Sequence, residues 1–178
     1  AGFTVRNDNG SLSFPMALLL DADSVVLRNN RISGTVYGSA SFGSAIFVMG
    51  GSKDHQIVGN EIQDNRAIGL AFIGGGVGSR VERNRITGNI IGVEYDSPGG
   101  DLGGGDASSA GRNMIAGNTM NDLWTNNEGI VIFARNNFWD NTPPMLGTDV
   151  YNCGWSGDPT DPTPHARLET QGARPVIQ

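Results

Sequence analysis

The sequence is poor in cysteine, histidine and lysine, and each shortage excludes something. Cys153 is the only cysteine among 178 residues, so no disulfide can form within the chain. The two histidines, His55 and His165, lie far apart and lack a partner at the spacing of a zinc site. Lysine occurs only at Lys53, and 12 basic residues face 18 acidic ones, which gives a net charge of −6. This balance lacks the basic footprint of nucleic-acid binding.

Long apolar runs are also missing. No run approaches the ~20 residues of a membrane-spanning helix, and no signal-peptide pattern is expected at Ala1. Apolar residues make up 38% and charged residues 17%, and much of the remainder is glycine, with 27 residues. Glycine does not recur at every third position, which excludes collagen, and the isoleucine, valine and phenylalanine content is too high for a disordered chain. A folded domain of ordinary size is therefore expected.

An internal repeat dominates the sequence. Five segments share the pattern apolar-x-x-Asn-x-apolar, and their asparagines are separated by 30, 24, 34 and 19 residues. A second short apolar run precedes each segment, usually by about ten residues. The repeated asparagines are Asn30, Asn60, Asn84, Asn118 and Asn137.

The apolar runs are too short for helices, because they last three to five residues and are interrupted by glycine and asparagine. Such runs predict short strands that stack on their equivalents one turn away, about 4.8 Å apart. We expect an all-β parallel β-helix of about five to six coils over residues 1–152. A Pro-rich, irregular tail is expected over residues 153–178. Because an open solenoid end exposes unpaired backbone, a missing segment or a partner is expected to cover the N-terminal end.

Stacking assigns roles to the repeated positions. The asparagines are expected to take left-handed conformations at the corners and to form an amide ladder. Outward charges in the same register, Arg31, Glu61 and Arg85, alternate in sign. We interpret them as a solvated, mutually stabilising row rather than an anion-binding arginine patch. The residues expected to form one inward apolar column are Ile32, Ile62, Ile86, Met120 and Trp139.

Two groups of motifs resemble a known family. The opening Gly2–Asn7 and the unit Val25–Ile32 resemble the right-handed parallel β-helix proteins of the pectate-lyase-like superfamily. The segments Asp101–Asn113, Asn121–Leu123 and Ala134–Trp139 resemble the closing coils of bacterial extracellular members. The resemblance implies a secreted, periplasmic or cell-surface protein. It implies no single activity, because the superfamily includes lyases, hydrolases, epimerases, adhesins and structural domains.

The best candidate for a chemical site is the glycine-rich insertion at residues 95–112. Carboxylates on and beside it suit Ca²⁺, which prefers six to eight oxygen ligands. The competing interpretation is a surface turn whose aspartates bond backbone amides. The resemblance to polysaccharide lyases implies that calcium would bridge to an acidic sugar and that Arg80, Arg83 or Arg112 would remove a proton. The predicted metal ligands are Glu94, Asp96, Asp101 and Asp106.

Two functions remain open. We favour a non-catalytic extracellular scaffold or binding module that presents a face to a protein or glycan partner. Five or six coils make a stack of only about 25–30 Å, which is short for the grooves of related enzymes. The alternative is a calcium-assisted polysaccharide lyase or epimerase. No catalytic residue is assigned and no cofactor other than calcium is expected. Some aromatic residues are candidates for stacking on sugars, although burial is as good an interpretation of them. These residues are Trp124, Trp155, Tyr37 and Tyr95.

Overall fold

The computed structural model describes residues 2–7, 15–36, 43–96, 99–125, 131–152 and 167–169. These residues form short strands joined by tight turns, and no helix occurs among them. The strands are β1 (Thr4–Arg6), β2 (Met16–Leu20), β3 (Val26–Arg28), β4 (Arg31–Ser33), β5 (Ser44–Met49), β6 (Gln56–Val58), β7 (Glu61–Gln63), β8 (Ile68–Ile73), β9 (Arg80–Glu82), β10 (Arg85–Thr87), β11 (Ile91–Tyr95), β12 (Met114–Ala116), β13 (Asn121–Thr125), β14 (Val131–Phe133), β15 (Val150–Asn152) and β16 (Arg167–Glu169).

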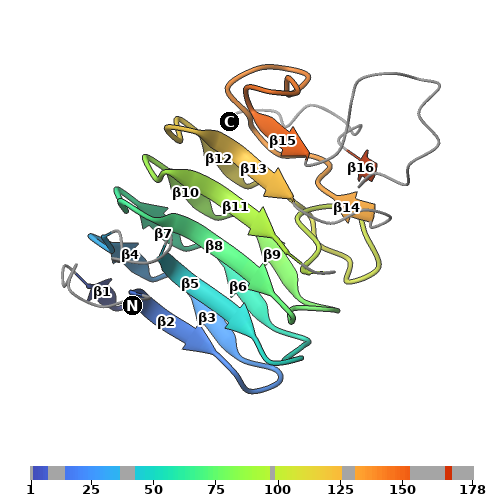
Figure 1. Cartoon of the computed structure of the whole chain (residues 1–178). Helices are drawn as coiled ribbons and strands as arrows, with labels where there is room; N and C mark the ends of the chain where they lie inside the picture. The colour runs from blue at the N-terminus through green and yellow to red at the C-terminus, as the bar shows by residue number, and fades with distance from the viewer. Residues whose placement is uncertain are drawn as a thin grey trace.

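The strands coil into a solenoid of about five turns (Figure 1). One sheet has the order β1-β4-β7-β10-β12, a second β15-β13-β11-β8-β5-β2, and a third β3-β6-β9. All of these strand pairs are parallel. The predicted all-β parallel β-helix is therefore confirmed. No helix in the described ranges is long and apolar enough to cross a membrane.

One part of the expected tail is described, and it is a strand. β16 pairs in parallel with β14, so residues 167–169 lie beside the last coil. The rest of residues 153–178 lies outside the described ranges. At the opposite end, β1, β2 and β3 are the terminal strands of their sheets, and Phe3, Leu19 and Val26 are exposed there. The covering of this end by a segment or partner stays a prediction.

The inward column of the five-stranded sheet is formed by stacked isoleucines. Ile32, Ile62, Ile86 and Ile115 align in register, and each is fully buried. The expectation for Met120 was wrong, because it is 46% exposed and Ile115 takes the inward place. The expected Trp139 does pack, partly buried, against this core.

The amide ladder exists, but one of its members differs from the prediction. It runs Asn30, Asn60, Asn84, Asn113 and Asn137. In each step, the backbone N–H and the side-chain Nδ2–H of one asparagine donate to the Oδ1 of the next. Asn118 belongs instead to a second ladder, with Asn65 and Asn89, at the next corner. The insertion displaces the true anchor of that coil to Asn113.

The left-handed conformation also falls one residue earlier than expected. The asparagine's backbone and side-chain amides both point along the stack, so the preceding residue makes the bend. The residues with positive φ before the first ladder are Asn29 (57°), Gly59 (66°), Arg83 (56°), Arg112 (60°) and Asn136 (61°). We call this row of bends the first corner.

The insertion completes a coil. Asp101 pairs with Arg80 of β9, and Gly103 pairs with Ala134, so the segment takes the place of a strand on the third side of the solenoid. Leu102, between them, is fully buried in the core. The insertion is therefore part of the scaffold as well as a surface loop.

Candidate functional site

No three of the four carboxylates predicted to bind calcium bring their oxygens within 4.8 Å of one another in the described ranges. Asp101 is buried, and its oxygens accept N–H groups from Gly103, Gly105 and Ser109 at 2.7–3.0 Å. This is the amide-bonding role that the sequence offered as the competing interpretation. Asp106 is exposed. Calcium binding at the insertion stays a prediction.

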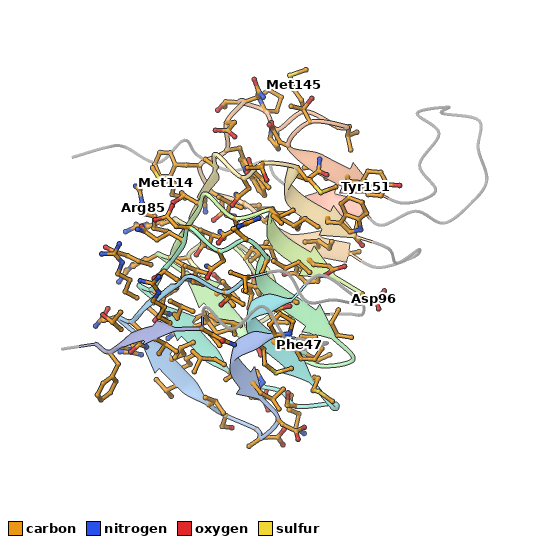
Figure 2. The ribbon with its side chains drawn as sticks, turned by 60° about the vertical axis from the view of Figure 1, so that its left-hand side comes forward. Phe47, Arg85, Asp96, Met114, Met145 and Tyr151 are labelled. Atoms are coloured by element: carbon orange, nitrogen blue, oxygen red, sulfur yellow. The ribbon has the colours of Figure 1, made fainter. Side chains whose placement is uncertain are left out.

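The other two predicted ligands lie near the end of β11. Asp96 is exposed, and Figure 2 shows it on the side of the molecule opposite Arg85. Glu94 is partly buried and lies in register between Ala71 and Trp124 on neighbouring strands. Burial, assisted by the negative charge of Asp96, raises the pKa of Glu94 to about 7.

The aromatic candidates are mostly used within the fold. Tyr95 is buried, stacks on Phe72 with ring centroids 5.0 Å apart and donates its hydroxyl hydrogen to the Gly100 carbonyl. Of the two interpretations offered for Tyr95, sugar stacking and burial, the structure shows burial. Trp124 stacks on Tyr151 with centroids 4.0 Å apart. The remaining candidates, Tyr37 and Trp155, lie outside the described residues.

Two of the three arginines named for the lyase alternative are exposed. Arg83 and Arg112 occupy the first corner in successive coils, and both are exposed. Arg80 is half-buried instead, donates to Gln56 Oε1 at 3.3 Å and has its Nε 3.9 Å from Glu82 Oε1. Arg83 and Arg112 thus add positive charge along one edge of the five-stranded sheet.

The outward row of this sheet is polar and exposed, and we call it the polar face. Thr4, Arg31, Glu61, Arg85 and Met114 align in consecutive coils. The predicted alternation of Arg31, Glu61 and Arg85 is confirmed in register. Figure 2 shows Arg85 and Met114 side by side on this face, where Arg85 Nη1 lies 3.2 Å from the Met114 sulfur.

A shallow hollow of about 250 Å³ extends the polar face at its N-terminal end. Phe3 stands at this hollow with its side chain 79% exposed, although its backbone is fixed. The Phe3 N–H donates to Asn30 Oδ1 at 3.0 Å, and its carbonyl accepts the Arg31 N–H at 2.8 Å. The hollow is lined by Gly2, Phe3, Thr4, Asn29, Asn30, Arg31, Gly59 and Glu61. No repeated motif marks this hollow in the sequence, where its one visible sign is an aromatic residue, Phe3, before the first repeat.

A carboxylate cluster was missed as well. Asp122, Asp140 and Asp149 place their ligand oxygens within 4.8 Å of one another, and the described residues hold no other such group of three acidic, histidine or cysteine side chains. No repeated motif marks these positions, because they come from a strand and from the irregular turn that follows the last asparagine anchor.

The comparison with protein families agrees with the repeat. A family model described as "Protein of unknown function (DUF1565)" matches residues 1–146. The chain belongs to the DUF1565 family. Searches of curated proteins and of solved structures each found no match. In this DUF1565 protein the matched residues include every strand from β1 to β14, together with the hollow and the polar face.

Proposed function

We propose that this DUF1565 domain is a non-catalytic extracellular binding module whose polar face and hollow hold an acidic glycan. The observation that carries the proposal is the exposed Phe3 beside Arg31 in the hollow, where the polar face begins. An aromatic ring beside a guanidinium suits a sugar that carries a carboxylate.

The geometry of Phe3 supports a binding role. Two hydrogen bonds fix the Phe3 backbone while the residue stays 79% exposed, so its ring is accessible for stacking on a ligand. Arg31 and Glu61 line the same hollow and supply a donor and an acceptor for hydroxyl and carboxylate groups. The Asn29 side chain adds an amide to this set.

The repetition of charge supports a polymer as the ligand. Strands of successive coils lie about 4.8 Å apart, so side chains in one register repeat at this spacing along the solenoid. Arg31, Glu61 and Arg85 alternate in sign along the polar face, and the exposed Arg83 and Arg112 of the first corner add positive charge that the expected mutually stabilising row did not include. This local excess opposes the net charge of −6 of the whole chain and would attract a polyanion.

The enzyme alternative receives less support from the predicted residues. A calcium-assisted lyase or epimerase would need carboxylates with oxygens free for a metal and a base facing them. Asp101 instead bonds three backbone amides, and the Tyr95 hydroxyl is buried against Gly100. These contacts favour a structural role for the insertion.

Binding to polygalacturonate or alginate, measured by calorimetry at low and high salt, tests the proposal. Phe3→Ala and Arg31→Ala should each weaken binding about tenfold or more, with affinity falling as salt rises. The matched controls Val77→Ala and Arg66→Ala change exposed residues elsewhere and should bind like the wild type. Absence of binding, or equal losses in the controls, would refute the proposal. Release of unsaturated product, followed by ultraviolet absorbance with calcium present, would establish the lyase alternative instead.

A further inference from the structure

The C-terminal end of the solenoid has aspartates at a register position where earlier coils have alanine or glycine. β11 pairs with β8 and β13 in a register that aligns Gly69, Gly92 and Asp122, and β15 continues this alignment to Asp149. A Cβ atom on Gly92 would lie 2.4 Å from the Asp122 carbonyl oxygen. This register position therefore holds only alanine or glycine in the earlier coils and aspartate in the last two.

These aspartates are held in place by their other contacts. The Asp149 carbonyl accepts the Asp122 and Leu123 N–H groups at 2.8 and 2.9 Å. The Asp149 carboxylate accepts the Asn141 Nδ2–H at 3.0 Å and the Met145 N–H at 2.8 Å. The loop after Trp139 is thereby fixed against the start of β13.

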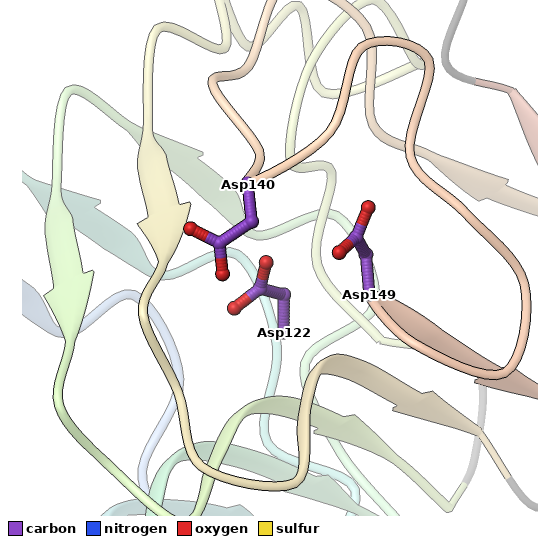
Figure 3. A group of neighbouring side chains, drawn as sticks. All are labelled: Asp122, Asp140 and Asp149. Atoms are coloured by element: carbon purple, nitrogen blue, oxygen red, sulfur yellow. The ribbon is translucent and has the colours of Figure 1, made fainter.

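Asp140 joins the pair from this loop. Its Oδ2 accepts the Gly117 N–H at 2.8 Å, one residue before Asn118, where the second asparagine ladder ends. The Asn118 Nδ2–H, with no further asparagine above it, donates to Asp122 Oδ1 at 2.8 Å. Figure 3 shows the three carboxylates of Asp122, Asp140 and Asp149 facing one another across a small space.

One oxygen in this cluster lacks a partner. Asp122 and Asp149 are each only 2% exposed, and Asp122 Oδ2 accepts no hydrogen bond from any of the residues that the structure describes. Like charges in register on adjacent strands repel, and a buried oxygen without a donor is costly. Burial and the charges of Asp140 and Asp149 accordingly raise the pKa of Asp122 to about 6. A cation between the carboxylates would remove both penalties.

We infer that Asp122, Asp140 and Asp149 form a site for a hard divalent cation, Ca²⁺ in the first place, which locks the last loop onto the solenoid. The donor set is made entirely of carboxylate oxygens, which suits calcium and not the nitrogen- and sulfur-preferring metals. Water molecules would fill the remaining coordination positions. The site shares no residue with the proposed glycan-binding surface, and the hollow at Phe3 lies at the opposite end of the solenoid.

Calcium titration of the full chain by calorimetry, together with thermal unfolding in EDTA and in excess Ca²⁺, tests this site. We expect one bound ion and a rise in Tm of about 5–10 °C at a Ca²⁺ concentration a hundredfold above Kd. Asp140→Asn, which alters an exposed ligand, should weaken Ca²⁺ binding at least tenfold. Asp21→Asn, a matched control at an exposed aspartate of an early coil, should bind like the wild type.

A second variant separates a metal site from a purely structural aspartate. In EDTA, Asp122→Asn should be at least as stable as the wild type, because the amide oxygen still accepts from Asn118 while the repulsion is relieved. It should lose the Tm rise with Ca²⁺. The inference is overturned if the wild type shows neither binding nor a Tm rise, if Asp140→Asn binds normally, or if Asp21→Asn loses binding to the same extent as Asp140→Asn.

Discussion

Removing one rung from the middle of the asparagine ladder should destabilise the whole solenoid. The side chain of Asn84 makes four hydrogen bonds and is 2% exposed. Its Oδ1 accepts the N–H and Nδ2–H of Asn60 at 2.9 and 3.1 Å. Its Nδ2–H donates to the Ile57 carbonyl at 2.8 Å and to Asn113 Oδ1 at 3.0 Å.

The expected loss in free energy of unfolding depends on which hydrogen bonds the partners of Asn84 keep after the substitution. In Asn84→Ala the buried N–H of Asn60 loses its acceptor, at a cost of about 1–3 kcal/mol. The other three hydrogen bonds contribute about 0.5 kcal/mol each at the low end, because Asn60 Nδ2 still reaches the Leu27 carbonyl and Asn113 Oδ1 still accepts the Asn84 N–H. We expect Asn84→Ala to lower the free energy of unfolding by about 3–4 kcal/mol.

Urea unfolding followed by circular dichroism measures this loss. Asn30→Ala, at the end of the same ladder, removes only two side-chain hydrogen bonds and should cost about 1–2 kcal/mol. Asn84→Asp keeps the shape but removes the donors and buries a charge, so it should cost more than Asn84→Ala. A loss for Asn84→Ala no larger than that for Asn30→Ala would refute the cooperative ladder.

Two further predictions concern β11 and its neighbour β8. Because the folded pKa of Glu94 is raised from 4.5 to about 7, the stability that its protonated form contributes is complete below about pH 4.5 and is lost as pH rises through about 7. Glu94→Gln should therefore match the wild type in acid but be more stable by about 1–3 kcal/mol near pH 8, after allowance for the partial exposure of Glu94. Urea unfolding at a series of pH values measures this difference. Parallel stability profiles for the wild type and the variant would contradict the prediction. Gly69→Ala should lower the free energy of unfolding by about 1–3 kcal/mol, because its Cβ would lie 2.7 Å from the Gly92 carbonyl oxygen. An unchanged urea midpoint would show that the backbones of β8 and β11 can move apart to accept the methyl group.

Much of the fold could be predicted because neighbouring coils repeat the same local chemistry. Ile32, Ile62 and Ile86 alternate with polar neighbours, so stacking alone places them inward. The alternating charges of Arg31 and Glu61 fall into register for the same reason. A pattern whose physical cause lies within a few neighbouring residues can be recognised in the sequence without knowledge of distant contacts.

Register within the irregular coil was not predictable in this way. Asn113 and Asn118 both precede apolar positions, and only the path of the insertion decides which amide meets Asn84. The residue with positive φ at the first corner is also decided by the stacking, because the backbone and side-chain amides of the next asparagine must both point along the ladder. Asp101 resembles a calcium ligand in sequence, yet its carboxylate bonds backbone N–H groups because the loop folds around it.

The sequence by itself determined the repeat, the strand length and the inward and outward alternation, since each depends on steric preferences and hydrophobicity over a few neighbouring residues. The tertiary structure alone decided which distant side chains meet. Asp122 and Asp149 lie 27 positions apart and become neighbours only because one coil places its backbone directly on the next. Phe3 gains its place beside Glu61 by the same stacking. The backbone path through each coil fixes these distances, because the length of each turn between strands decides which residues share a register. The conformational preference of single residues does not determine them.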